Sequence, residues 1–182
     1  WWSKKITHRR ISKFGEAKKL LIEEFLDGEE MSFFTIHDGD NFKNFGTAQD
    51  HKRVLEGDKG KNTGGMGAYS PSRLINDELE SKIINKIIKP TLKGLSEYNT
   101  KFCGFLYTGL MIVNNEPYLI EYNVRMGDPE CQTILPKVKT DLFEIFLASC
   151  NGTLNEINIE WIDKKSLCVV LCSNGYPDEY QK

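Results

Sequence analysis

The sequence lacks any apolar run that approaches the roughly 20 residues needed to cross a membrane as a helix. It also lacks a basic excess, because 24 Lys and Arg residues against 26 Asp and Glu residues give a formal net charge of −2. A broad nucleic-acid-binding face needs such an excess. We therefore expect neither a nucleic acid nor a membrane as a partner. No apolar stretch of signal-peptide length follows the basic start of the chain.

Paired cysteine motifs are absent as well. The chain has five cysteines, an odd number, and no CxxC spacing. Cys168 and Cys172 would lie about 13 Å apart on one strand, too far for a disulfide. We therefore expect free thiols, buried as small apolar fillers, in a reducing and cytoplasmic compartment.

The length of 182 residues favours one domain or one lobe of a larger protein. With 40% hydrophobic residues, the chain has enough apolar material for a core. The chain does not start with Met, so we expect it to begin inside a longer protein.

Two pairs of β-rich runs are each joined by a turn-forming sequence, which predicts two hairpins. The first pair is 31–37 and 42–47 around Asp38-Gly39-Asp40, and the second is 102–113 and 118–124 across Asn114-Asn115. Further strands are expected at 20–26 and 166–172. Residues 1–19 show no pattern that predicts an element.

Two helices are expected between the strands. One covers 77–96, with Asn76 or Asp77 as its N-cap, and Pro90 should kink or interrupt it. The other covers 138–150 and ends at Asn151-Gly152, with an inner face that we list as Leu142, Ile145, Phe146 and Cys150. Hairpins with helices between them predict an α+β fold with antiparallel sheet.

The strongest chemical signal is the run from Leu119 to Arg125. Alternate side chains of a strand share a face, so Glu121, Asn123 and Arg125 should point one way. The apolar set of Ile120, Tyr122 and Val124 should then face the core. Carboxylate and amide oxygens suit hard cations such as Mg²⁺, and an arginine beside them could hold a phosphate. A solvated polar face on an edge hairpin is the alternative.

Two more segments support this site. Asp128 and Glu130 follow just past the strand, where a turn can bring them back over the same surface. Glu23 and Glu24 interrupt an apolar run, and a buried carboxylate needs a partner or an open site. A twisted edge strand with both acids in water would explain Glu23 and Glu24 equally well.

Residues 48–73 read as one long loop, and a loop of this length is either functional or a wrong assignment. It contains the cluster Asp50, His51, Lys52 and Arg53. Its glycine-rich part, 62–67, offers backbone N–H groups that could cradle phosphate or carboxylate oxygens. The segment matches neither a Walker A motif nor a dinucleotide-binding GxGxxG. A flexible surface loop is the alternative here.

Five strings in this order resemble the glycinamide ribonucleotide synthetases, which are ATP-grasp ligases. They are Glu-Glu-Phe-Leu-Asp-Gly-Glu-Glu from residue 23, Gln-Asp-His-Lys-Arg from 49, Asn-Thr-Gly-Gly-Met-Gly-Ala-Tyr-Ser-Pro from 62, Gly-Phe-Leu-Tyr from 104 and Glu-Tyr-Asn-Val-Arg-Met-Gly-Asp-Pro-Glu from 121. The resemblance runs from about residue 16 to the end and implies an ATP-grasp lobe. It departs from the family pattern at Met126 and Cys131, neither of which is an expected ligand.

The resemblance implies ATP- and Mg²⁺-dependent (or Mn²⁺-dependent) joining of glycine to 5-phosphoribosylamine through a glycyl phosphate, a step of purine synthesis. By position, Glu121 and Asn123 would hold the metal, and Arg125 and Asp128 would be catalytic. ATP would meet Glu23, Glu24, Phe25, Leu26 and Glu30, with the backbone near Glu24 and Leu26 at adenine and Glu30 at ribose. The substrates would meet Asp50, His51, Lys52, Arg53, Asn62, Thr63, Gly64, Gly65, Met66, Gly67 and Glu130.

The resemblance also divides the chain. It implies an unassigned segment at 1–15, a partial ATP-grasp domain at 16–165 and the start of a C-terminal domain at 166–182. Most of the small lobe that closes over ATP in the family is missing. A truncated, inactive nucleotide-binding fragment is therefore an alternative, as is a non-catalytic interaction module. We expect a monomer.

Overall fold

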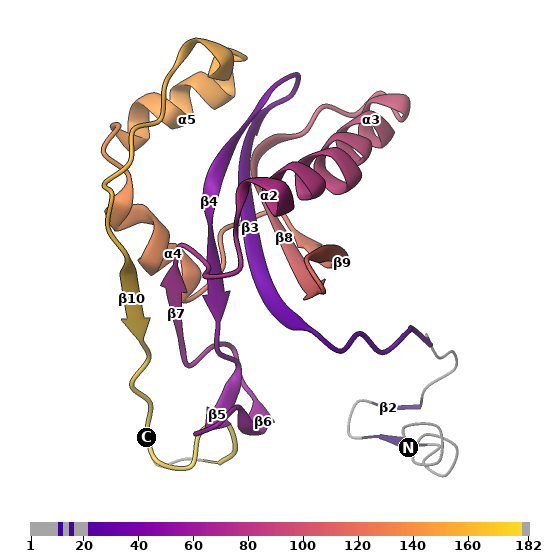
Figure 1. Ribbon diagram of the computed structural model, residues 1–182, viewed down its shortest axis with the longest axis vertical. Coiled ribbons are helices and arrows are strands. Elements are labelled where there is room, and N and C mark those ends of the chain that lie inside the picture. Colours follow the sequence, from indigo (N-terminus) through magenta and orange to yellow (C-terminus); the bar gives the residue numbers. More distant parts are fainter. Residues whose placement is uncertain (1–10, 13–14, 17–21, 180–182) are drawn as a thin grey trace.

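The computed structural model describes residues 11–12, 15–16 and 22–179. Its main feature is a six-stranded antiparallel sheet in the order β10-β7-β4-β3-β8-β9, with helices on both faces (Figure 1). The strands are β3 Glu29–Asp38, β4 Phe42–Asp50, β7 Gly67–Ser70, β8 Cys103–Val113, β9 Glu116–Asn123 and β10 Ser166–Val169. The predicted α+β class with antiparallel hairpins is confirmed.

The remaining elements are short. Two small antiparallel pairs lie outside the main sheet: β1 Ile11–Ser12 with β2 Gly15–Glu16, and β5 Arg53–Leu55 with β6 Lys59–Asn62. The helices are α2 Asp77–Ile83, η1 Ile84–Ile88, α3 Lys89–Glu97, α4 Glu130–Ile134, η2 Leu135–Lys137, α5 Leu142–Asn151 and η3 Leu154–Glu156. Within the described ranges, no helix has the length and apolar character to cross a membrane.

Both predicted hairpins form, β3 with β4 and β8 with β9, and β3 pairs with β8 at the centre of the sheet. Alternation along β3 sends Met31 and Phe33 to the face covered by α2, η1 and α3. Phe34 and Ile36 point to the opposite face, toward α4 and α5. The central strand therefore carries two cores, one on each side.

The helix expected at 77–96 is present as α2, η1 and α3 in succession. It starts at Asn76, whose side chain accepts a hydrogen bond of 2.9 Å from the backbone N–H of Leu79. Pro90 interrupts it as predicted. The turn before it widens to a π-helix, in which the Lys89 N–H donates to the Ile84 carbonyl. A proline clashes with the carbonyl four residues earlier, and the wider turn relieves that clash.

Three predicted elements need correction. Residues 22–26 form no strand and pair with no described strand, while Leu20 and Leu21 lie outside the described residues. Residues 48–73 are not one loop, because they contain the end of β4, the β5–β6 hairpin and β7. The helix expected from 138 starts at Leu142, where Asp141 caps it by accepting from the Phe143 N–H at 2.8 Å.

The inner face of α5 also differs from the prediction. Ile145, Ala148 and Ser149 are buried, whereas Phe146 and Cys150 are exposed. Gly152 ends the helix in the left-handed region, as expected from its sequence.

The five cysteines are free thiols, as expected. The expectation that they fill the core is wrong: Cys103, Cys150 and Cys172 are exposed, and Cys131 and Cys168 are half-buried. The last strand is shorter than the predicted 166–172 and ends at Val169. As β10 it pairs with β7, at the edge of the main sheet.

His37 lies at the end of β3 and is fully buried, with its Nε2 2.7 Å from the Thr35 hydroxyl. Its Nδ1 has no hydrogen-bond partner among the residues that the structure describes. Burial lowers the pKa of His37 to about 4, against a smaller opposing effect of Asp38. The unfolded chain therefore binds a proton that the folded chain does not between about pH 6.5 and pH 4. The contribution of His37 to the free energy of unfolding therefore falls as the pH drops through this window.

We expect urea unfolding at pH 5 to show a loss of about 1–2 kcal/mol from this histidine relative to pH 7. His37→Gln should remove this loss, so that the change in the free energy of unfolding from pH 7 to pH 5 is about 1–2 kcal/mol more favourable than in the wild type. His51→Gln, which changes an exposed histidine, should leave the loss unchanged. Equal slopes for the wild type and His37→Gln would contradict the assignment.

Candidate functional site

The β8–β9 hairpin carries the run from Leu119 to Arg125, and a β-bulge changes its pattern. Gly109 lies opposite Glu121 and Leu110 opposite Leu119, so Ile120 has no partner in the ladder. Ile120 is 52% exposed, and Val124, just past the strand, is 74% exposed. The prediction that both face the core is therefore wrong, and only Tyr122 packs against it.

Glu121 and Asn123 lie on one face of β9, as alternation predicts, with Asn123 opposite Tyr107. The Asn123 Nδ2 donates to the Glu121 Oε1 at 3.2 Å, so their polar ends meet. Rotation of the amide would turn its oxygen toward the same point. A carboxylate and an amide oxygen so close together form a donor set that fits Mg²⁺ or Mn²⁺.

Gly109 leaves room for this pair. A Cβ on Gly109 would lie 3.2 Å from the Glu121 Cγ and 3.1 Å from the Tyr107 ring. A side chain at this position would crowd the carboxylate and the tyrosine.

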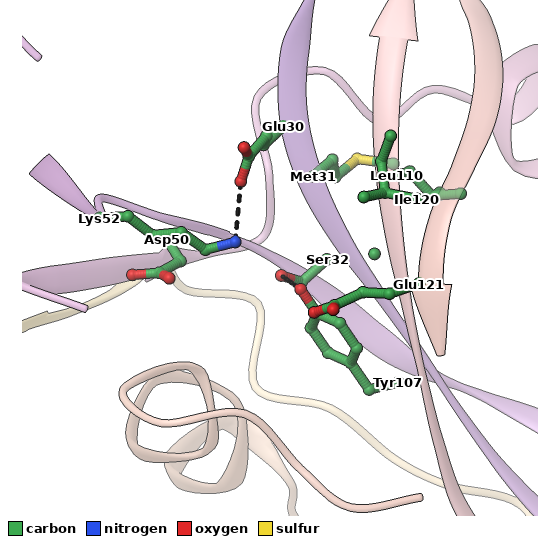
Figure 2. A pocket seen from close by; sticks show the side chains of 10 residues that line it. Glu30, Met31, Ser32, Asp50, Lys52, Tyr107, Leu110, Ile120 and Glu121 are labelled. Carbon is green, nitrogen blue, oxygen red and sulfur yellow. Dashed lines mark hydrogen bonds and ion pairs between the residues drawn. The ribbon is translucent and has the colours of Figure 1, made fainter. Parts of the chain in front are cut away.

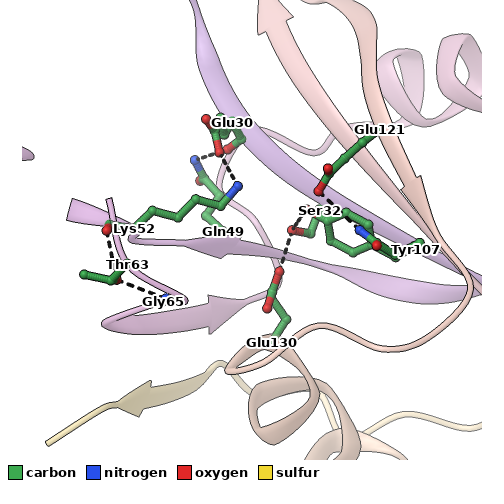
Figure 3. Close-up of polar contacts among 10 residues, drawn as sticks. Glu30, Ser32, Gln49, Lys52, Thr63, Gly65, Tyr107, Glu121 and Glu130 are labelled. Carbon is green, nitrogen blue, oxygen red and sulfur yellow. Dashed lines mark hydrogen bonds and ion pairs between the residues drawn. The ribbon is translucent and has the colours of Figure 1, made fainter. Parts of the chain in front are cut away.

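The turn after β9 brings Asp128 and Glu130 back over the same surface. Glu130 is buried, and its Oε1 accepts from the Ser32 hydroxyl at 3.0 Å (Figure 3). A Cβ on Gly127 would lie 2.3 Å from a Glu130 carboxylate oxygen, so a side chain there would require the carboxylate to move. The Arg125 Nη1 donates to the Met126 carbonyl at 3.0 Å, and Gln132 donates to Asp128 at 2.7 Å.

These residues surround one cavity of about 180 Å³. Its lining joins residues from β4, β8, β9, the start of α4 and the glycine-rich segment. They are Asp50, Lys52, Gly64, Tyr107, Glu121, Asn123, Arg125, Gly127, Asp128 and Glu130. The structure therefore places the proposed metal pair, the arginine and both later acids together.

A second cavity of about 120 Å³ lies beside the first (Figure 2). From β3 and the end of β4 it is lined by Glu30, Met31, Ser32, Asp50 and Lys52. From β8 and β9 it is lined by Tyr107, Gly109, Leu110, Ile120 and Glu121. Asp50, Lys52, Tyr107 and Glu121 line both cavities.

Lys52 is held in place by Glu30, whose Oε2 accepts from its ammonium at 2.9 Å (Figure 3). Burial acts to lower the pKa of Lys52, but the hydrogen bond and the charge of Glu30 outweigh it and the net shift is upward. The ammonium thus stays protonated in the lining of both cavities. Gln49 adds a bond of 3.1 Å from its amide to the Glu30 carbonyl.

Asp50 is the last residue of β4 and has no ion pair within the described part of the chain. Burial raises its pKa to about 7, and the negative charge of Glu130 adds to the rise, while Lys52 opposes it. At neutral pH this carboxyl is therefore close to half-protonated.

The glycine-rich segment folds against the end of β4. Met66 N donates to the His51 carbonyl at 2.8 Å, Thr63 N donates to the Lys52 carbonyl at 2.7 Å, and Gly65 N donates to the Thr63 hydroxyl at 3.1 Å. Gly67 accepts from His51 N at 2.9 Å. These amides are already engaged within the chain, so the segment positions residues 50–52 rather than offering a free row of N–H groups.

The segment expected to meet adenine lies on a third cavity, of about 520 Å³. Phe25 and Leu26 line it together with Glu30, and Asp50, His51, Lys52, Arg53 and Asn62 line it from the other side. Glu23 and Glu24 are exposed and line none of these cavities, and neither do Thr63, Gly65, Met66 and Gly67.

Sequence reasoning missed Ser32 and Tyr107, which line the smaller cavity beside Glu121. Burial raises the pKa of Tyr107, whose hydroxyl accepts a long hydrogen bond of 3.4 Å from Ser32. Alternation along β8 puts Phe105, Tyr107 and Gly109 on one face. That pattern could have found Tyr107 once the β8–β9 pairing was known.

Comparison with known proteins agrees with this architecture. The family described as phosphoribosylglycinamide synthetase, ATP-grasp (A) domain, matches residues 4–131. A phosphoribosylamine–glycine ligase from Vigna unguiculata is 51% identical over 172 residues, which cover 93% of this chain and 55% of the relative. The Haemophilus influenzae ligase of the same name is 49% identical over 171 residues, covering 93% and 40%.

Two solved structures are similar to this chain as well. The crystal structure of the phosphoribosylamine–glycine ligase from Thermotoga maritima matches with a TM-score of 0.77 and 36% identity, covering 87% of this chain and 40% of that one. The L-amino acid ligase from Bacillus licheniformis, at 16% identity and a TM-score of 0.57, shares the fold. The chain spans between 32% and 55% of the length of the curated relatives named first. It belongs to the phosphoribosylglycinamide synthetase ATP-grasp domain family.

Proposed function

We propose that this chain supplies the catalytic face of an ATP-dependent ligase that joins glycine to 5-phosphoribosylamine in purine synthesis. The observation that carries the proposal is the Glu121–Asn123 pair, set in one cavity with Lys52 and Arg125. Membership of the ATP-grasp family supports the use of ATP and a divalent metal in general. The choice of Mg²⁺ or Mn²⁺ rests on the oxygen donors of Glu121 and Asn123.

In the proposed reaction, a glycine carboxylate oxygen attacks the terminal phosphorus of ATP, and ADP leaves. The amine of phosphoribosylamine then attacks the carbonyl carbon of the glycyl phosphate, phosphate leaves with the C–O bonding electrons, and the new amide nitrogen gives up one proton to the solvent or to the departing phosphate. A metal ion held by Glu121 and Asn123 would neutralise phosphate charge. Lys52 and Arg125 line the cavity and add fixed positive charge to it. Phosphoryl transfer depends mainly on such positioning and charge.

The proposed residue roles divide between those that bind ATP and those that bind the two small substrates. Adenine and ribose would lie in the third cavity, which is bordered by Phe25, Leu26 and Glu30. Glu23 and Glu24 would lie near its entrance. The small substrates would be bound by Asp50, His51, Lys52, Arg53 and Asn62. Asp128 and Glu130 would contact them from the other side of the cavity, and residues 63–67 would hold residues 50–52 in position. A cytoplasmic location and a monomeric state belong to the same proposal.

The alternative is a nucleotide-binding fragment without ligase activity. Calorimetric titration of the chain with ATP, with and without Mg²⁺, tests the binding half of the proposal. We expect Mg²⁺ to strengthen ATP binding about tenfold or more, because phosphate oxygens and Glu121 would share the ion. A folded chain that binds no ATP with Mg²⁺ present would overturn the assembled site.

A further inference from the structure

A fourth cavity is lined by none of the residues that form the three described above. Its volume is about 680 Å³. Sites for small molecules commonly have volumes of about 300–1,000 Å³ and combine apolar walls with a few polar groups. The proposed ligase reaction uses no residue of this cavity, so a ligand bound in it would be separate from the ligase substrates.

The fourth cavity lies beside the part of β4 that β7 does not cover. β4 pairs with β7 only through Gln49 and Asp50, and β7 ends at Ser70. The chain then leaves the sheet, and the Ser72 N–H donates to the Thr47 hydroxyl at 3.0 Å. From this side the cavity is lined by Asn44, Gly46 and Thr47 of β4, by Pro71 and Ile75, and by Glu80 of α2.

The opposite wall is the segment 161–165, which is fixed to the end of η2. Trp161 forms an isolated bridge with Val138, and the Ile162 N–H donates to the Lys137 carbonyl at 2.7 Å. A further bond of 2.8 Å from the Lys164 N–H to the Ile162 carbonyl turns the chain. These contacts bring two stretches of the chain onto one cavity, which is lined on this side by Lys137, Trp161, Ile162, Asp163, Lys164 and Lys165.

Lysines give the cavity an excess of positive charge. Its charged lining residues are three lysines and two acids: Lys137, Lys164, Lys165, Glu80 and Asp163. None of the three lysines forms an ion pair with another residue in the described ranges. The Glu80 carboxylate instead accepts a hydrogen bond of 2.7 Å from the Asn44 amide. The lysines are therefore available to an anion from solution.

Lys137 is half-buried, whereas Lys164 and Lys165 are exposed. The Lys137 ammonium donates one long hydrogen bond of 3.4 Å, to the Ser70 hydroxyl. Burial lowers the pKa of Lys137, and the charge of Asp163 opposes this only in part. A bound anion would compensate for the lost hydration and stabilise the charged ammonium.

Trp161 gives the cavity a flat apolar wall. Its indole meets the Phe45 ring edge to face, with 5.5 Å between the ring centres. Gly46 lies against the indole, where a Cβ would be in ordinary contact at 3.7 Å. Trp161 is half-buried by these contacts and still lines the cavity. The aromatic ring of a ligand could pack against it there.

We propose that this cavity binds a nucleoside monophosphate, with its base against Trp161 and its phosphate at the lysines. The inference goes beyond the proposed ligase reaction and does not rest on it. A phosphate carries about two negative charges at neutral pH and several acceptor oxygens, so it can use more than one lysine. A nucleoside lacks that charge and a sugar phosphate lacks the ring, so each should bind more weakly than the nucleotide.

The test follows the indole N–H signal of Trp161 in ¹H–¹⁵N NMR spectra of the chain. The signal is assigned by its loss in Trp161→Phe, and it reports on this cavity because Trp161 lines none of the other three. The chain is titrated at pH 7, without Mg²⁺, with adenosine monophosphate, adenosine or ribose 5-phosphate. We expect the nucleotide to half-saturate the shift at a concentration about tenfold lower than either of its parts.

Lys164→Ala/Lys165→Ala removes two exposed charges, so the chain should stay folded and bind the nucleotide about tenfold more weakly. Lys89→Ala/Lys93→Ala removes two exposed charges from α3, outside the cavity, and should leave the binding unchanged. The inference is overturned if the nucleotide does not shift the Trp161 signal, or if the Lys164→Ala/Lys165→Ala chain keeps its affinity. It is also overturned if ribose 5-phosphate or adenosine binds as tightly as the nucleotide.

Discussion

Replacing Glu121 by alanine should abolish the Mg²⁺ dependence of ATP binding by this chain. In an enzyme extended to the length of its relatives, we expect the same change to lower ATP turnover about 100-fold or more, with the fold retained. Glu121 contributes the carboxylate of the oxygen pair with Asn123, and its side chain is exposed at the cavity rather than packed in a core. Loss of the carboxylate removes the charged ligand and leaves a neutral amide, which binds a hard cation weakly.

Glu116→Ala is the matched control on the same strand. Glu116 pairs with Lys82 and Lys86 at the surface, where ion pairs contribute little, so its removal should leave the stability nearly unchanged. The Mg²⁺ dependence should survive in this variant. If the Glu121→Ala enzyme kept turnover within about threefold of the wild type, the metal assignment would be wrong.

Gly65→Ala should destabilise the fold by about 2–4 kcal/mol, measured by urea unfolding. Gly65 has a φ of +129°, which an alanine adopts only with strain. Its new Cβ would also lie 2.5 Å from the Pro129 Cδ and 2.9 Å from the Asp50 Oδ1. Relief of these contacts requires the glycine-rich segment to move away from the turn at Asp128.

The neighbouring glycine offers a close comparison. A Cβ on Gly64 would meet only the Tyr176 hydroxyl, at 3.8 Å, which is ordinary contact. Gly64→Ala should therefore change the free energy of unfolding by less than about 1 kcal/mol. Equal stabilities for the two alanine variants would show that the close approach at Gly65 is not a constraint.

Short sequence patterns correctly predicted the two hairpins and the start of the first long helix. Turn sequences at Asp38-Gly39-Asp40 and Asn114-Asn115 identified both hairpins, and Asn76 identified the start of α2. Alternation placed Glu121 and Asn123 on one face. It failed at Ile120, because a bulge shifts the register there, and the glycine at the bulge, Gly109, lies on the partner strand rather than beside Ile120.

Long-range contacts could not be read from the sequence. Ser32 meets Glu130, and Gly65 meets Pro129, across elements that are distant in the chain. Nothing in the strand pattern of 31–37 shows that a serine on it will hold a carboxylate from α4. The segment 20–26 reads as a strand by composition, but strand formation needs a partner, and 22–26 has none among the described strands.

The position of β10 sets an order of assembly for the sheet. The β3–β4 and β8–β9 hairpins join neighbours in sequence and can form early, whereas β10 pairs only through Ser166–Val169 with β7, far back in the chain. During synthesis the sheet can therefore be completed only after β10 has been made. Leu167 and Val169 are exposed, so little apolar burial retains the strand once it is docked. Amide hydrogens of β10 should therefore exchange before those of β3, with the outer edge of β7 opening first.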